Sequence, residues 1–217
     1  MNPYLLFAGM LCCANTATAQ QELVPRQYRE IKSVQGDLDK DGIPEKVVAY
    51  NMKEEEETNG VDRELVIFKK QKSKWTIWKR STQAIGNSMD GGMMGDPFED
   101  IAITGGLLVI SQSGGSNWKW NRTDKYRYQN NQFELIGYTN LYGMPCAYWA
   151  TADYNLSTGK LVYKKEKEQC DDEGNPIKVT KEAETFIRKL PAKITLGNRK
   201  SSEIKIVTPK YKGEIYL

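Results

Sequence analysis

Three aspartates at alternate positions are the residues of this sequence with the clearest capacity for chemistry. Asp37, Asp39 and Asp41 belong to the segment Gly-Asp-Leu-Asp-Lys-Asp-Gly-Ile-Pro-Glu at 36–45. Alternate acidic residues in a tight loop direct their carboxylates toward one centre, and Gly42 permits the sharp turn that brings the next carbonyl inward. Converging carboxylates repel one another, so the pattern predicts a hard cation with about six to eight oxygen ligands, namely calcium.

The same spacing supplies the rest of the ligand set. We expect the Ile43 carbonyl and the Glu45 carboxylate to complete the protein ligands, because Val48 stands at the twelfth position, where an EF-hand carries its last carboxylate. Val48 lies in an apolar run, so the loop leads into a strand. The alternative is a solvated turn held by Asx-type hydrogen bonds, with no metal.

Residues 36–50 resemble the calcium loops of the FG-GAP and VCBS families of secreted bacterial proteins. In those loops a Gly-Asp-x-Asp-x-Asp-Gly-x-x-Asp/Glu turn precedes a β-strand, as it does here. The resemblance implies a structural calcium ion and no active site. The families usually repeat the loop once per blade of a β-propeller, whereas this sequence carries one copy.

Short segments rich in β-branched and aromatic residues recur along the chain and are separated by Gly, Asn, Asp and Pro. They are 46–50, 63–69, 75–79, 107–111, 125–129, 133–138, 161–164 and 204–207. Tight connections at 70–74, 129–132 and 155–160 predict hairpins, which make neighbouring strands antiparallel. We therefore predict an all-β fold of antiparallel sheets, as a sandwich or an incomplete propeller-like arrangement, with at most one short helix.

One segment, 180–190, fits two structures. Its apolar residues lie at helical spacing, yet it could also pair with 159–168 across the turn at 171–176. We favour the strand.

The first nineteen residues have the layout of a secretory signal peptide. An apolar run from Tyr4 to Cys13 precedes small residues ending Ala17-Thr18-Ala19, so we expect export to the periplasm or beyond and one β-rich domain at 20–217. The run is shorter than the roughly 20 residues that span a bilayer, and no later stretch is apolar enough to do so. The alternative is a lipoprotein anchored through Cys12 or Cys13, although Met10-Leu11 before Cys12 and Leu11-Cys12 before Cys13 differ from the usual lipoprotein pattern.

The cysteines, the absence of histidine and the net charge limit the kinds of site and partner that the sequence can support. Cys146 and Cys170 form a disulfide most simply in an oxidising compartment, and two free thiols are the alternative. The 217 residues include no histidine, which removes histidine-based triads and the commonest zinc ligands. The net charge of +3 comes from intermixed charges, which predicts no nucleic-acid partner.

Two further features could contact a ligand. Trp118 and Trp120 alternate as in a strand, and aromatic rings on one face can stack on sugars, although core packing is the interpretation we favour. The glycine- and methionine-rich segment 89–97 is an irregular connection that could line a cleft. The four glutamates at 54–57 are typical of a solvated loop.

These features predict an exported, non-catalytic envelope protein with a structural calcium ion, binding a protein or a glycan. The rival prediction is a periplasmic hydrolase or enzyme inhibitor that uses 89–97 as a cleft wall. A pocket lined by Asp90, Asp96 and residues 113–116 would favour the rival. An exposed face carrying Trp118 and Trp120 would favour binding.

Overall fold

The computed structural model describes residues 23–53, 59–200 and 204–217. Within them the secondary structure is β1 Arg29–Gly36, β2 Glu45–Asn51, β3 Arg63–Gln71, β4 Lys74–Ser81, the 3-10 turn η1 Gly92–Met94, β5 Phe98–Thr104, β6 Leu107–Gly115, β7 Lys119–Gln129, β8 Gln132–Met144, β9 Tyr148–Asn155, β10 Lys160–Cys170, β11 Pro176–Ile187, β12 Lys205–Val207 and β13 Glu214–Tyr216. The predicted signal peptide at 1–19 and the glutamate run at 54–57 lie outside the described residues.

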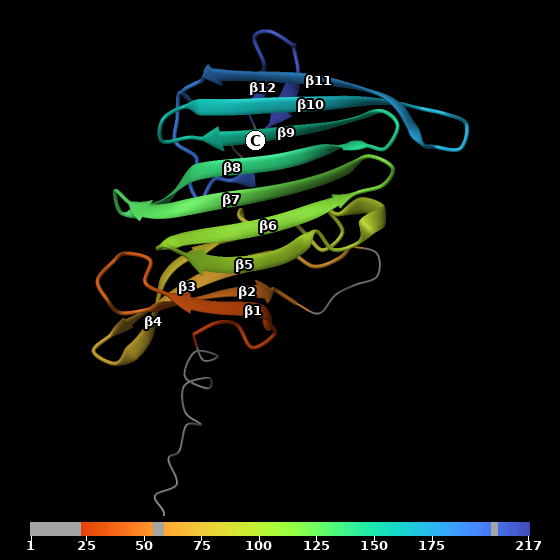
Figure 1. Ribbon diagram of the computed structural model, residues 1–217. Helices are drawn as coiled ribbons and strands as arrows, with labels where there is room; N and C mark the ends of the chain where they lie inside the picture. Colours follow the sequence, from red (N-terminus) through yellow and green to blue (C-terminus); the bar gives the residue numbers. More distant parts are fainter. Residues whose placement is uncertain (1–22, 54–58, 201–203) are drawn as a thin grey trace, which may run out of the picture.

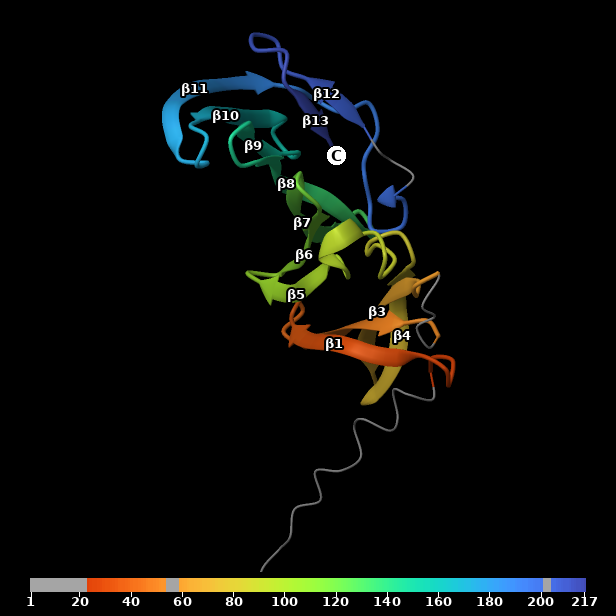
Figure 2. The same cartoon turned by 90° about the vertical axis from the view of Figure 1, so that its right-hand side faces the viewer.

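The strands form antiparallel sheets in which each strand pairs with its neighbour in the sequence. A small sheet has the order β1-β2-β3-β4 and a large sheet runs from β11 to β5 (Figure 1). β12 pairs with β13 (Figure 2). Neither larger sheet closes into a barrel. The all-β, antiparallel prediction is confirmed, and no helix in the described residues is long and apolar enough to cross a membrane.

The main core lies between the small sheet and one face of the large sheet. Alternation along β2 and β3 directs Val47, Ala49, Leu65 and Ile67 into this core, where they join Ile110 and other residues of the large sheet. The residues of β2 and β3 that alternate with these, including Val48 and Phe68, point to the opposite face of the small sheet and pack there in a second apolar cluster. Both faces of β2 and β3 are therefore buried, which explains their continuous apolar sequence.

The large sheet is strongly curved, and β12 and β13 lie on its inner side (Figure 2). The C-terminal hairpin is fixed there by specific contacts. The Tyr138 hydroxyl donates to the Tyr216 carbonyl at 2.7 Å. Gly213 lies against the Tyr163 ring so closely that a Cβ at this position would stand 2.4 Å from the hydroxyl oxygen.

The predicted hairpins are confirmed. Asn130 and Asn131 have φ of 52° and 61°, which suits a two-residue turn of the mirror-image type between β7 and β8. Segment 180–190 is strand up to Ile187, since β11 pairs with β10 along its length. The strands that the sequence did not predict are β1, β5, β9 and β13.

A disulfide joins Cys146, in the turn between β8 and β9, to Cys170 at the end of β10, with the Cα atoms 5.3 Å apart. This confirms the predicted bridge over the alternative of two free thiols. In the chain-entropy description, closing a loop of this length stabilises the fold by about 3 kcal/mol.

Candidate cation loop and ligand cleft

The acidic loop connects β1 to β2, and Asp37 organises it. Its carboxylate accepts the backbone N–H of Lys40 at 2.7 Å and that of Gly42 at 2.9 Å. Gly42 has a φ of 84°, as the predicted sharp turn requires. Leu38 is buried in the main core and anchors the loop between the two sheets.

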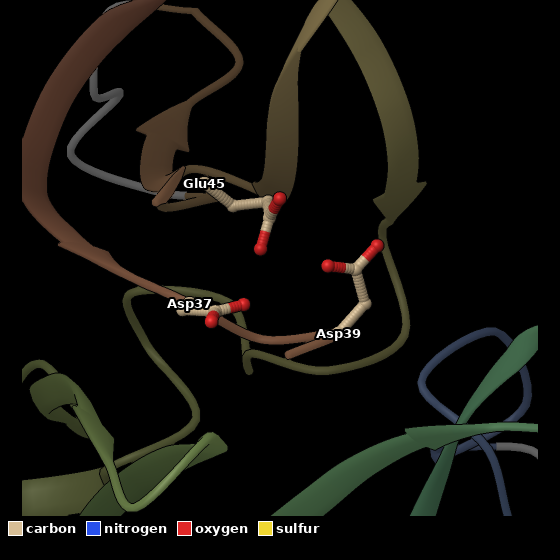
Figure 3. Close-up of side chains that lie close together, drawn as sticks. All are labelled: Asp37, Asp39 and Glu45. Atoms are coloured by element: carbon tan, nitrogen blue, oxygen red, sulfur yellow. The ribbon is translucent and has the colours of Figure 1, made fainter. Parts of the chain in front are cut away.

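One carboxylate oxygen from each of Asp37, Asp39 and Glu45 lies within 4.8 Å of the others. The three side chains point toward a common centre (Figure 3). Glu45 is fully buried; its Oε2 accepts the Leu38 N–H at 2.8 Å, whereas its Oε1 has no hydrogen-bond partner. Burial raises the pKa of Glu45. A buried acceptor without a donor is costly, so this oxygen suits a cation.

The structure also places Lys69 of β3 at this loop, which the sequence reasoning missed. Its ammonium group bonds to Asp39, lies 2.7 Å from Asp41 Oδ2 and lies 3.7 Å from Glu45 Oε1. Nothing in the sequence distinguishes Lys69 from the other basic residues, because the contact depends on the pairing of β2 with β3.

Asp41 and Ile43 stand slightly apart from the three clustered carboxylates. Asp41 turns one oxygen toward Lys69 and accepts the Ile43 N–H with the other at 2.8 Å. The pKa of Asp41 is lowered, first by the hydrogen bond from Lys69 and then by that from Ile43. The side chain of Ile43 is exposed, so any ligand role falls to its backbone.

A cleft of about 920 Å³ lies on the inner face of the large sheet. Its floor comes from β6 to β10, and the C-terminal hairpin and the segment around 86–97 border it. Cross-strand register forms one row from Trp120 through Tyr142 and Ala150 to Lys165. Ala150 is the small member of this row, so the sheet face is hollow between the aromatic residues and Lys165.

Of the two predicted tryptophans, Trp120 lines the cleft and Trp118 does not. Trp118 stacks on Tyr142, which does line the cleft, with ring centroids 5.3 Å apart and planes 12° from parallel. Tyr148 lies against both Trp118 and Tyr142. Tyr126, in contrast, is fully buried and belongs to the main core.

The segment 89–97 borders the cleft through Asp90 and Pro97 only. Asp96 instead forms a two-point ion pair with Arg63, at 2.9 and 2.6 Å. Asp96 and residues 113–116 are not among the described residues that line the cleft. The arrangement that would favour a hydrolase is therefore found only in part.

The chain matches no protein-family model and no curated protein. The resemblance of residues 36–50 to calcium loops therefore stays a prediction.

Proposed function

We propose that this chain is an exported, non-catalytic envelope protein whose ligand site is the cleft and whose ligand is a glycan. The observation that carries the proposal is the cleft itself, a large hollow bordered by half-exposed aromatic rings and hydrogen-bonding side chains. Sites for small ligands combine a concave shape with flat apolar surfaces and a few polar groups.

A glycan fits this surface because its rings have both apolar faces and hydroxyl edges. Trp120, Tyr142 and Tyr148 bring aromatic rings and polar tips together in one place, each ring with one neighbour over it: Arg122, Trp118 and Lys165 respectively. Asn140 and Lys165 line the same hollow and can bond to hydroxyl groups. A protein segment is the alternative occupant.

The carboxylates that line the cleft argue against hydrolysis. Asp90 accepts the Asn87 N–H at 2.7 Å. Glu214 bonds to Lys205 and to the Tyr216 hydroxyl, and these bonds lower its pKa. A glycosidase needs one carboxylic acid whose pKa is raised so that it can donate a proton. The pKa of Glu214 is instead lowered, which favours the ionised carboxylate that cannot donate a proton.

Calorimetric titration with neutral and acidic oligosaccharides tests the proposal. Trp120→Ala should abolish binding, while Trp149→Ala should preserve it, because alternation places Trp149 on the other face of β9. Thermal unfolding of each variant controls for folding. If no oligosaccharide binds, the glycan proposal fails; if chromatography shows shortened products, the protein is a hydrolase.

We further propose that the acidic loop holds a structural calcium ion through Asp37, Asp39, Asp41, the Ile43 carbonyl and Glu45. The converging carboxylates support this, and so does Glu45 Oε1, which accepts no hydrogen bond and has only the Lys69 ammonium group at 3.7 Å. Extracellular sites of this type bind with dissociation constants of about 10⁻⁴ to 10⁻³ M. Calcium titrated to about 10 mM should therefore raise the unfolding midpoint in a saturable way. Asp39→Asn should remove the rise; an equal rise in that variant would contradict the site.

A further inference from the structure

The charges that line the cleft are predominantly positive. The cationic side chains are Arg122, Lys165, Arg199, Lys200 and Lys212, and the acidic side chains are Asp90 and Glu214. Two of these charges are already neutralised, since Arg199 pairs with Asp124 and Glu214 pairs with Lys205. An excess of positive charge therefore faces the hollow.

Arg122 lacks a carboxylate partner among the described residues, and its Nε is buried without a hydrogen-bond acceptor. Asp124 lies two residues further along the same face of β7, but it pairs with Arg199 and not with Arg122. Arg199 Nε and Nη2 donate to Asp124 at 2.7 and 3.2 Å. Gln112, opposite Arg122 on β6, uses its amide on the backbone of Gly86 and Ala84. The Arg122 guanidinium carbon lies 5.6 Å from the centroid of the Trp120 ring. This cation–π contact uses no N–H donor, so the group keeps donors for an external acceptor.

Lys165 provides a second positive position in the same hollow. Its ammonium group lies 3.7 Å from the centroid of the Tyr148 ring, and it forms no ion pair within the described part of the chain. Burial lowers the pKa of Lys165, and Lys167 lowers it further. An acid group at this position would stabilise the ammonium ion.

These two residues belong to strands that are well separated in the sheet. Arg122 lies on β7 and Lys165 on β10, three strand spacings away, which corresponds to about 14 Å between the strand axes. Trp120, Tyr142 and Ala150 form the row that leads toward Lys165. An extended ligand with repeated acid groups matches this spacing.

We infer that the cleft binds an acidic oligosaccharide, with acid groups at Arg122 and Lys165 and sugar rings against Trp120 and Tyr142. This inference rests on the glycan-binding function proposed above and specifies the charge of the glycan. The required chemistry is a repeated anionic group on a sugar chain, carboxylate or sulfate.

Calorimetry with oligogalacturonate and with its methyl ester, which is the same chain without charge, tests the inference. We expect oligogalacturonate or a sulfated heparin octasaccharide to bind, and removal of charge from the ligand to weaken binding at least tenfold. Arg122→Met and Lys165→Met should each weaken binding at least tenfold, and Arg122→Lys should restore part of it. Lys125→Met, on the other face of β7, is the matched control and should change nothing.

The outcomes separate the two proposals. Equal binding of the ester together with an unchanged Arg122→Met variant would show a neutral glycan site and overturn the inference while leaving glycan binding intact. Binding of a polyglutamate peptide in preference to every acidic glycan would overturn it in favour of a protein partner. If no glycan of any charge binds, the proposed function itself fails.

Discussion

Replacing Lys69 with methionine tests the electrostatics of the acidic loop most directly. Lys69 is the cation that the fold itself supplies to Asp39, Asp41 and Glu45, and it also lies over the Trp78 ring at 5.1 Å. Methionine retains an apolar stem of similar length against Trp78 and removes only the charge. The variant therefore leaves the carboxylates facing one another without their internal counter-ion.

The expected size follows from the exposure of the contacts. The Lys69 side chain is 20% exposed, and a partly exposed ion pair contributes about 0.2–1 kcal/mol. Loss of two close pairs should cost about 0.4–2 kcal/mol in the presence of a chelator. For a chain of this size that corresponds to a fall of about 1–8 °C in the unfolding midpoint.

Calcium should cancel this difference in stability between Lys69→Met and the native protein. An ion that enters the native loop has to displace the Lys69 ammonium group, whereas in Lys69→Met it does not. The same 0.4–2 kcal/mol then becomes a gain in calcium affinity of about 2- to 30-fold. Calorimetry and thermal unfolding in chelator and in about 10 mM calcium measure both effects.

Lys70→Met is the matched control. Lys70 is the next residue of β3 and lies over Trp75 at 5.0 Å, on the side of the strand away from the loop. It should change neither the midpoint in chelator nor the affinity for calcium. The reasoning about Lys69 is refuted if its variant behaves like Lys70→Met. A fall in chelator with no calcium effect in either protein would instead identify Lys69 as the permanent counter-ion and refute the calcium site.

Three further predictions concern the disulfide, the buried ion pair between Arg199 and Asp124, and the predicted signal peptide. Cys170→Ser should lose about 2–5 kcal/mol of stability, and a reducing agent should bring the native protein to the same urea midpoint. Arg199→Met should cost about 3–5 kcal/mol in urea unfolding, because it leaves the carboxylate of Asp124 buried without its charged partner; a double change that also makes Asp124 leucine should recover part of this loss. Mass spectrometry of the exported protein should give an N-terminus at Gln20, and a lipid-modified cysteine at position 12 or 13 would contradict that prediction.

The parts of the fold that sequence could predict are those set by local chemistry. The Asn130–Asn131 turn and the apolar runs of β2 and β3 are readable from a few neighbouring residues. β1 could not be read this way, since it is an edge strand with a mostly polar sequence and an exposed face. In β9, burial does alternate, but Ala150 and Ala152 fill the buried positions and alanine is a weak strand signal.

The acidic loop is likewise set by neighbouring residues, whereas the cleft is set by contacts between distant parts of the chain. Asp37, Asp39 and Glu45 converge because they are close in sequence, so their spacing was sufficient to predict the cluster. The cleft depends on the register of several strands, which brings Trp120 level with Lys165, and on a C-terminal hairpin packed over the sheet. No local pattern specifies either relation, and for this reason Arg122 and Lys165 were not identified from sequence.

The position of the loop explains what a structural cation would do for the cleft. Gly36, just before the loop, lies so close to Ile103 of β5 that a Cβ there would stand 2.6 Å from the isoleucine methyl group. Lys69 ties the same loop to β3. The loop therefore joins the small sheet to the β5 edge of the large sheet, whereas the cleft is lined by β6 to β10 and the C-terminal hairpin. Because the loop contributes no side chain to the cleft, a cation there would support the large sheet without touching the cleft.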